Sequence, residues 1–244
     1  MTDYTAATYG DRIAEVYDEL YELAAETDAA VELLADLAVG GPVLELGIGT
    51  GRLALPLARR GLPVAGIDAS EAMVAKLRAK PGGDAVALTV GDFADVAVDG
   101  PFRLVVVVFN TFFALLTQDE QVRCVTNAAA RLEPGGRFLI EAFVPDLTRF
   151  DRGQRTASER VGTDLVALEV STHDISRQHV TSAHVLLRES GTEIYPVQIR
   201  YCWPSELDLM ARLAGLELEH RWADWRRTPF TASSTGHVSV WRRP

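Results

Sequence analysis

The sequence predicts an α/β fold in which a doubly wound, mainly parallel sheet carries an inserted antiparallel meander. Residues 42–143 alternate short apolar runs with stretches of helical spacing, which favours right-handed strand–helix–strand crossovers. The first apolar run ends in a glycine-rich turn at 47–51, the place where such sheets bind ligands. Residues 158–203 alternate without helical spacing, which is typical of antiparallel strands.

The N-terminal segment is predicted to be helical over residues 10–38. Its apolar residues recur at three- and four-residue spacing, with acidic residues between them. A second helical stretch over 29–38 ends at the pair Gly40-Gly41. The apolar stripe of the first part consists of Ile13, Val16, Tyr17, Leu20, Leu23 and Ala24.

The central part of the chain alternates predicted strands and helices. The third of these helices is closed by the turn Pro134-Gly135-Gly136. One strand contains the run Val105 to Val108, which indicates burial on both faces of the sheet. The predicted strands are 42–46, 63–67, 85–90, 103–109 and 137–143, and the predicted helices are 52–60, 70–80 and 119–132.

The C-terminal part begins with the meander and then returns to the main sheet. Ser190-Gly191 is a turn signal between the last two meander strands. The chain has no repeat, low-complexity tract or interdomain linker, so we expect a single domain over 1–244 with an insertion at 145–203. The predicted strands are 165–170, 179–187, 193–203, 216–222 and 237–241, with a helix over 205–213.

The composition is that of an ordinary globular protein, with 244 residues, 48% of them hydrophobic and 24% charged. The net charge of −10 repels phosphate backbones, so no nucleic-acid partner is expected. Cys124 and Cys202 are too few for a disulfide framework or a metal knuckle, so we expect buried thiols and no metal. No targeting pattern is visible and the apolar run 104–109 cannot span a bilayer, which predicts a cytoplasmic protein without a membrane partner.

The predicted ligand-binding loop is Gly47-Ile48-Gly49-Thr50-Gly51-Arg52, preceded by Glu45. Its glycines let a ligand approach backbone amides without interference from side chains. A dinucleotide site would have its third glycine at the position of Arg52. The spacing therefore argues against a nicotinamide cofactor.

Two acidic residues follow later strands of the predicted sheet. Asp68 ends the second strand, 17 residues after Gly51, where a carboxylate can accept both hydroxyl groups of a ribose. The alternative is a helix cap, for which Ser70 already qualifies. Gly91-Asp92-Phe93 follows the third strand, where an acid and an aromatic ring could bind and stack on adenine. The alternative there is a simple turn with a core phenylalanine.

Taken together, these motifs resemble those of class I S-adenosylmethionine-dependent methyltransferases. The shared features are Glu-x-Gly-x-Gly-x-Gly, the distal Asp68, Gly91-Asp92-Phe93 and the Leu-x-Pro-Gly-Gly turn at 132–136, within residues 8–145. The resemblance implies a Rossmann-like sheet of seven strands whose last strand is antiparallel, with the 145–203 insertion as a lid over the acceptor pocket. It implies S-adenosyl-L-methionine as cofactor, bound by Tyr9, Tyr17, Glu45, Gly47, Gly49, Gly51, Asp68, Ala69, Met73, Gly91, Asp92, Phe93, Phe109 and Asn110.

Residues 8–18 are also similar to the N-terminal helix of amino-sugar N-methyltransferases from antibiotic pathways. In those enzymes aromatic residues of this segment fold over the cofactor, and Tyr9 and Tyr17 match them; a core position is the alternative for Tyr17. The chain departs from that group at Ala114, near the place of a histidine, and its neighbouring phenylalanines favour a more apolar acceptor. The Asn-Pro-Pro-aromatic motif of nucleic-acid amino-methyltransferases is absent.

The predicted reaction is methyl transfer to nitrogen or oxygen of a small molecule, in specialised metabolism. Such an enzyme mainly aligns the reactants and excludes water, and it needs a base only if the acceptor must lose a proton. His184 is the first candidate base and His173 the second, with His179 and Glu141 as further candidates. A structural role is the alternative for each histidine.

Other functions remain open at this point. The same motifs would occur in a protein that binds the cofactor without methyl transfer, as a cyclase or a binding module. A nicotinamide oxidoreductase is a third hypothesis, against which Arg52 counts. The oligomeric state stays open, with a homodimer as the candidate assembly.

Overall fold

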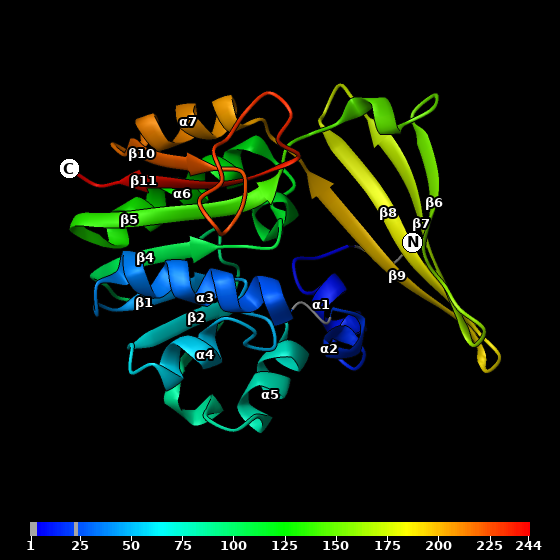
Figure 1. Ribbon diagram of the computed structural model, residues 1–244, viewed down its shortest axis with the longest axis horizontal. Helices are drawn as coiled ribbons and strands as arrows, with labels where there is room; N and C mark the ends of the chain where they lie inside the picture. The colour runs from blue at the N-terminus through cyan, green and yellow to red at the C-terminus, as the bar shows by residue number, and fades with distance from the viewer. Residues whose placement is uncertain (1–3, 22–23) are drawn as a thin grey trace.

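The computed structural model describes residues 4–21 and 24–244, and Figure 1 shows two sheets side by side. The larger sheet has seven strands in the order β10-β11-β5-β4-β1-β2-β3. Strands β1 to β5 pair in parallel, and β11 is antiparallel to both of its neighbours, which confirms the predicted fold class. The strands are β1 (Val43–Leu46), β2 (Val64–Asp68), β3 (Ala87–Val90), β4 (Phe102–Val107), β5 (Leu132–Phe143), β10 (Glu217–Trp222) and β11 (Gly236–Arg242).

Helices cover both faces of this sheet and bury a separate core on each. On one face, α3 (Ala24–Ala38) and α4 (Ala54–Arg59) pack on β1 and β4 through a core that contains Leu34, Leu57 and Val106. On the other face, α6 (Gln118–Arg131) and α7 (Pro204–Leu213) enclose Phe112, Phe138 and Trp241. None of the helices in the described ranges is long and apolar enough to cross a membrane.

Local sequence signals explain where several helices begin. Ser70 caps α5 (Glu71–Ala79), since its hydroxyl accepts the N–H of Met73 at 3.1 Å. Thr117 and Glu120 form a reciprocal capping box at the start of α6. These helices lie within one or two residues of the predicted ranges 70–80 and 119–132.

The second sheet is the meander, with strands β6 (Gln154–Val161), β7 (Leu165–Asp174), β8 (His179–Arg188) and β9 (Gly191–Arg200). It stands beside the carboxyl ends of the main strands (Figure 1), and we call the face turned toward them the inner face of the meander. Cross-strand pairing places Leu165, Ala167, Glu169, Ser171 and His173 of β7 on this face, with Val180, Ser182, His184, Leu186 and Arg188 of β8 and Tyr195 of β9.

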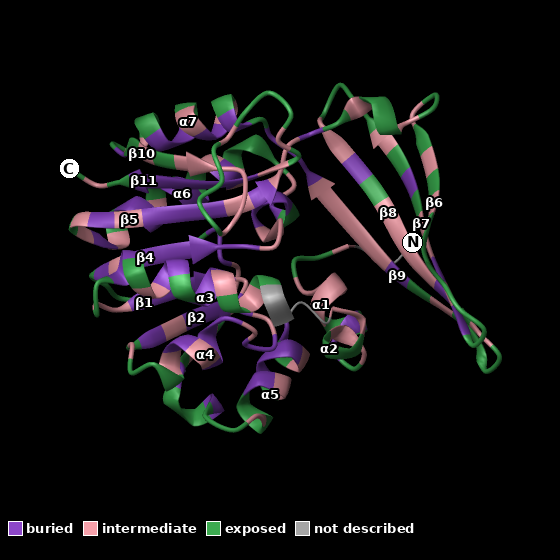
Figure 2. Cartoon of the chain, viewed as in Figure 1, coloured by how far each residue is buried: buried purple, intermediate pink, exposed green. Residues whose placement is uncertain are grey.

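The meander differs from the prediction at both of its ends. Strand β6 begins at Gln154, before the predicted start at 158, because it is a polar edge strand with hardly any apolar alternation to detect. Its residues are largely exposed in Figure 2. Strand β9 ends at Arg200 rather than at 203, because Trp203 is the N-cap residue of α7 and Pro204 occupies its first turn.

The prediction of helical structure over residues 10–38, with a second stretch over 29–38, was wrong in its first part. The structure has two short helices, α1 (Thr8–Ile13) and α2 (Tyr17–Leu20), before α3 begins at Ala24; Leu23 lies outside the described residues. Tyr21 leaves helical backbone angles at the end of α2, with a φ of −116° and a ψ of 62°. Contacts with distant residues outweigh helix periodicity here, because Asp11 accepts a 2.6 Å hydrogen bond from Ser70 and Asp18 accepts one of 2.6 Å from Thr50. These contacts hold α1 and α2 between the two sheets (Figure 1).

Candidate active site

The glycine loop after β1 is built from backbone conformations that other residues avoid. Gly47, Gly49 and Gly51 have φ angles of 70°, 55° and 84°. A Cβ atom at Gly47 would lie 2.3 Å from Thr111 Cγ2, whereas one at Gly49 would meet nothing within 4 Å. Gly47 therefore allows close packing of the loop that follows β4, and Gly49 leaves its backbone open to a ligand.

Asp68 lies at the end of β2, directly beside this loop. Its Oδ2 accepts the N–H of Gly49 at 2.8 Å, and its Oδ1 accepts the N–H of Ser70 at 2.9 Å. Burial raises the pKa of Asp68, although these backbone donors, with that of Ala69, oppose the shift. Each oxygen of an ionised carboxylate has a second lone pair, so Asp68 can still accept two hydroxyl groups. Ser70 itself caps α5, which leaves Asp68 free for a ligand.

Glu45, in β1, has a buried carboxylate with one unpaired oxygen. Its Oε2 has no hydrogen-bond partner among the described residues. Burial raises the pKa of Glu45 to about 8, while Arg52 lowers it and Asp68 raises it further. A buried carboxylate oxygen without a donor is rare in proteins, and it fits a site that receives an N–H donor from a ligand.

Arg52 is the cation of this site. Its guanidinium lies 5.3 Å from the centroid of the Phe109 ring, and its Nη1 donates to Thr27 Oγ1 at 3.1 Å. Its charge lowers the pKa values of Glu45, Tyr17 and Glu141 against the dominant effect of burial. From the sequence, Arg52 served only as an argument against a dinucleotide. Its position directly after the third loop glycine was the signal for a cation at this site.

The loop after β4 is strained at its first two residues. Phe109 and Asn110 have left-handed φ angles of 57° and 61°, which are uncommon outside glycine and cluster at functional sites. Two side-chain contacts hold them: the Glu141 carboxylate accepts the N–H of Phe109, and Asn110 Oδ1 accepts the N–H of Phe143 at 2.7 Å. Burial raises the pKa of Glu141. Glu141 thus supports the loop through the backbone of Phe109.

The residues predicted around the adenine, and Met73, predicted beside the ribose, have different surroundings. Gly91 has open space around it, and Asp92 Oδ1 accepts the N–H of Ala94 at 2.8 Å in a tight turn. Phe93 is only 8% exposed and belongs to the core between the main sheet and α6, which favours the alternative of a core phenylalanine. Met73 is buried beside Ile13.

Aromatic side chains of the N-terminal segment connect it to the end of β4. The hydroxyl groups of Tyr9 and Tyr21 are 3.0 Å apart, and the rings of Tyr17 and Tyr21 are 4.9 Å apart. Tyr21 also meets Phe109 edge-on at 5.2 Å. Tyr21, which the prediction missed, therefore joins Tyr9 and Tyr17 to Phe109, and the charges of Arg52, Glu45 and Asp68 act on the Tyr17 hydroxyl. Its spacing of four residues from Tyr17 was the available signal.

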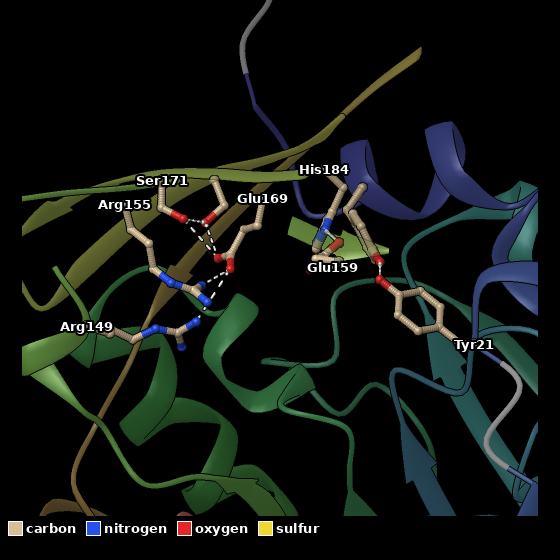
Figure 3. A network of polar contacts seen from close by, with 9 residues as sticks. Tyr21, Arg149, Arg155, Glu159, Glu169, Ser171 and His184 are labelled. Atoms are coloured by element: carbon tan, nitrogen blue, oxygen red, sulfur yellow. Dashed lines mark hydrogen bonds and ion pairs between the residues drawn. The ribbon is translucent and has the colours of Figure 1, made fainter. Parts of the chain in front are cut away.

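The inner face of the meander carries a chain of polar contacts, shown in Figure 3. The Nδ1 atom of His184 lies 3.0 Å from Glu159 Oε2. Glu169, the cross-strand partner of His184 on β7, bonds Arg155, and it accepts the hydroxyl of Ser171 at 2.9 Å. Tyr21 points toward this group from the N-terminal segment (Figure 3). The inner face therefore has a polar part that holds the first candidate base, beside an apolar part formed by Leu165, Ala167 and Leu186.

The other histidine candidates occupy different surroundings. His173 lies on the same face of the meander, stacked on Phe150 at 4.6 Å, and its Nε2 is 3.0 Å from the Tyr201 hydroxyl. His179 pairs with Asp174 and Arg200, and its ring contacts the carbonyl oxygen of Leu116. The contact of His179 with the main-chain oxygen gives that side chain a structural role.

Comparisons with known proteins place this architecture in a family. A family described as "Methyltransferase domain" matches residues 43–136. The cypemycin N-terminal methyltransferase of Streptomyces sp is 30% identical over 205 residues, which are 84% of this chain and 84% of that protein. The structure of the CcbJ methyltransferase from Streptomyces caelestis shares 43% identity and a TM-score of 0.92, covering 98% of this chain and 99% of that one. The chain belongs to the S-adenosylmethionine-dependent methyltransferases.

The resemblance found in the sequence is thereby confirmed, and S-adenosylmethionine is the cofactor of this methyltransferase. The S-adenosylmethionine-bound CalS10, an amino pentose methyltransferase from Micromonospora echinaspora, has a TM-score of 0.70 at 20% identity, with 95% of each chain covered. At that identity the likeness shows the fold alone. The relatives favour methyl transfer over the hypotheses of a binding module and of a nicotinamide oxidoreductase.

Proposed function

We propose that this methyltransferase transfers a methyl group from S-adenosylmethionine to a nitrogen or oxygen atom of a small molecule in specialised metabolism, with nitrogen as the first choice. The observation that carries the proposal is the placement of the polar part of the inner face of the meander, with His184, opposite the carboxyl edge of the main sheet. The cypemycin N-terminal methyltransferase, similar over most of both chains, supports a nitrogen acceptor.

The residues along the carboxyl edge fit the cofactor, which supplies an activated sulfonium methyl group when it binds. We call the edge formed by Glu45, residues 47–52, Asp68, Phe109 and Asn110 the cofactor edge. Asp68 would accept the ribose hydroxyls through its two free lone pairs. The unpaired Oε2 of Glu45 would accept the ammonium group, and Arg52 would bind the carboxylate of the methionine part.

The remaining predicted residues take supporting parts in this proposal. Gly47, Gly49 and Gly51 give the ligand access to the backbone, and Gly91 and Asp92 lie where the adenine would be bound. Ala69 and Met73 line the start of α5 beside Asp68. Phe93 supports that region from the core.

The chain's own residues would prepare the reaction by exclusion of water and by proton transfer. Tyr9, Tyr17 and Tyr21 close the site from the N-terminal side, which removes solvent from the reacting atoms. His184 is the proposed base and His173 the second candidate. Glu141 is proposed to hold the loop after β4, because its carboxylate is engaged with the N–H of Phe109.

The 145–203 insertion acts in this proposal as the lid over the acceptor pocket, within one domain of 244 residues. A net charge of −10 favours a small-molecule acceptor over a nucleic acid. A cytoplasmic location and a homodimer stay predictions. Size-exclusion chromatography with light scattering tests the latter.

Calorimetry with S-adenosylmethionine, S-adenosylhomocysteine and NAD tests the cofactor assignment. We expect the first two to bind and NAD not to bind. We expect Asp68→Ala to weaken both about tenfold or more, since a hydrogen bond to a charged group contributes about 1.5–3 kcal/mol. Mass spectrometry of paired amine and alcohol acceptors then tests the transfer. Equal affinities of Asp68→Ala and the wild type would contradict the assignment of the ribose site.

A further inference from the structure

We propose that Glu159 is a positioning residue that turns the Nε2 lone pair of His184 toward the acceptor, and that the acceptor is an amine that arrives as an ammonium ion. This inference rests on the proposed function and names the acceptor class of the same site. Three observations carry it: the hydrogen bond between Glu159 and His184, a bulge in β6, and the charges on the inner face of the meander.

The hydrogen bond determines which ring nitrogen of His184 carries the proton. Glu159 Oε2 lies 3.0 Å from Nδ1. An ionised carboxylate can only accept, so Nδ1 must donate, and the neutral ring keeps its lone pair on Nε2. Glu159 is an exposed acid with a 41% accessible side chain, whereas the His184 side chain is 21% accessible. The contact thus orients a ring that is itself partly enclosed.

A bulge brings Glu159 to this position. Strand β7 lies between β6 and β8, and the pairing of β6 with β7 shifts register between Ser158 and Arg160. Glu159 is the extra residue, and a bulge re-aims its side chain. The residues on either side of Glu159 pair regularly, Ser158 with Leu168 and Arg160 with Ala167, and the small Ala167 leaves room for a side chain to cross toward β8. The bulge therefore allows the Glu159 side chain to contact His184.

The charges around His184 favour a cationic acceptor. Glu169 is neutralised by Arg155, with Arg149 at 3.4 Å, and Glu193 pairs with Arg188 at 3.7 Å. In the described part of the chain, the Glu159 carboxylate contacts His184 and pairs with no lysine or arginine. It is therefore the one carboxylate of this group whose charge no arginine or lysine balances. The titratable and charged groups that face His184 are Glu159 of β6, Glu169 of β7, Arg188 of β8, Tyr195 of β9 and Tyr9 and Tyr21 of the N-terminal segment.

The same carboxylate is linked to the cofactor edge through Tyr21. Burial raises the pKa of the Tyr21 hydroxyl, and the negative charge of Glu159 raises it further, which places the two groups within electrostatic reach. The ring of Tyr21 lies 5.2 Å from that of Phe109 at the end of β4. Tyr21 therefore lies between the group around His184 and Phe109 of the cofactor edge.

The proton balance of the step follows from this arrangement. The ammonium group of the acceptor gives one proton to His184 Nε2, and Glu159 stabilises the imidazolium that forms. The amine lone pair then forms the N–C bond with the methyl carbon, while the C–S bond breaks and its electron pair stays on sulfur. The proton on His184 leaves to solvent. The unbalanced negative charge of Glu159 also attracts the positive charge of an ammonium ion, which a neutral hydroxyl acceptor does not carry.

The test of the positioning role is long-range proton–nitrogen NMR of the histidine rings in the full-length protein. The wild type should show the Nδ1–H tautomer for His184. The signals are assigned to His184 because they are absent from the spectrum of His184→Ala. Glu159→Ala should shift His184 toward the Nε2–H form, whereas Glu159→Gln should keep the Nδ1–H form, since an amide oxygen still accepts. Glu189→Gln, in the exposed turn between β8 and β9, is the matched charge control and should leave the spectrum unchanged.

The acceptor class is tested with pairs of probes that differ in one group. Each pair presents an amine or a hydroxyl at the same position, on a tripeptide N-terminus or on a methyl hexoside. The wild type should methylate the amine member of a pair. His184→Ala should lower kcat/KM about 100-fold, and Glu159→Ala should lower it about tenfold. Both variants should keep the wild-type Kd for S-adenosylmethionine. Glu159→Asp should restore part of the activity that Glu159→Ala loses.

The outcomes separate the two proposals. An Nε2–H tautomer in the wild type, or one that Glu159→Ala does not change, overturns the positioning role even if S-adenosylmethionine binds. Methylation of the hydroxyl member of a pair overturns the amine assignment. It is also overturned if neither member is methylated in any of the pairs. Failure of S-adenosylmethionine to bind overturns the proposed function, while the tautomer still reports on Glu159.

Discussion

The cofactor edge and the inner face of the meander hold their polar groups in different ways. At the cofactor edge the backbone positions them, through glycines in the left-handed conformation and through the N–H groups of Gly49 and Ser70, which donate to Asp68. On the inner face, side chains from different strands meet, as His184 of β8 does with Glu159 of β6 across β7. Substitutions on the meander are therefore expected to change acceptor choice while cofactor binding persists.

The largest effect is expected from Gly47→Val at the cofactor edge. Its Cβ would lie 2.3 Å from Thr111 Cγ2, and the φ of 70° is one that β-branched residues avoid. Overpacking and the left-handed backbone together cost about 4 kcal/mol. We expect a clearly lower Tm and loss of S-adenosylmethionine binding by calorimetry.

Gly49→Ala is the matched control, because its Cβ meets nothing within 4 Å. It should lose only about 1 kcal/mol of stability from its left-handed backbone. Equal melting temperatures for the two variants would show that the contact with Thr111 does not determine the loop.

Arg200→Ala tests whether side-chain contacts at the end of the last meander strand stabilise the protein. The Arg200 guanidinium is buried and bonds Glu206 at 2.7 Å and Gln178 at 2.9 Å. Its removal leaves Glu206 without its cation, which should lower the free energy of unfolding by about 3 kcal/mol in urea titrations. Arg177→Ala, at the exposed pair with Asp174, should change it by less than about 0.5 kcal/mol. A smaller loss at Arg200 than at Arg177 would refute the anchoring role.

Glu45→Gln tests the buried carboxylate through the pH dependence of stability. Since the folded pKa of about 8 lies above the ordinary 4.5, the protonated form is favoured by folding. This contribution is complete below about pH 4.5 and falls by up to about 1.4 kcal/mol per pH unit until pH 8. Urea titrations of the wild type without cofactor should show this fall, and Glu45→Gln should lack it.

The cofactor should reverse part of that trend, because its ammonium group would favour ionised Glu45. The stabilisation by S-adenosylmethionine should thus increase between pH 5 and pH 8 in the wild type, and less so in Glu45→Gln. A wild-type stability curve that is flat over this range, or parallel to that of Glu45→Gln, would contradict the unpaired carboxylate.

The smallest effect is expected from Tyr21→Phe, which removes the 3.0 Å contact with the Tyr9 hydroxyl but keeps the ring beside Phe109. The free energy of unfolding should fall by about 1 kcal/mol. Tyr21→Ala should lower it further and weaken S-adenosylmethionine binding, because the ring contact is also lost. Identical affinities for both variants would show that the ring does not cover the cofactor edge.

The order of strands and helices in the main sheet could be predicted because each element has its own local pattern. Buried strands such as β4 are apolar except for single residues such as Arg103, and helix ends carry signals such as Ser70 and the Thr117 capping box. Strand β6 could not be found fully, because a polar edge strand lacks that pattern. The breaks around α1 and α2 were missed because they depend on contacts of Asp11 and Asp18 with residues far along the chain.

The sequence by itself determined the glycine loop and Asp68, because a site made of backbone conformations and strand ends is written in neighbouring residues. Only the tertiary structure decided that Arg52 and Tyr21 meet at Phe109 and that Glu159 holds His184. The physical reason is that these contacts depend on the register of β6, β7 and β8 and on the path of the N-terminal segment. A one-residue shift in a strand would turn its side chains to the opposite face, and no local pattern encodes that choice.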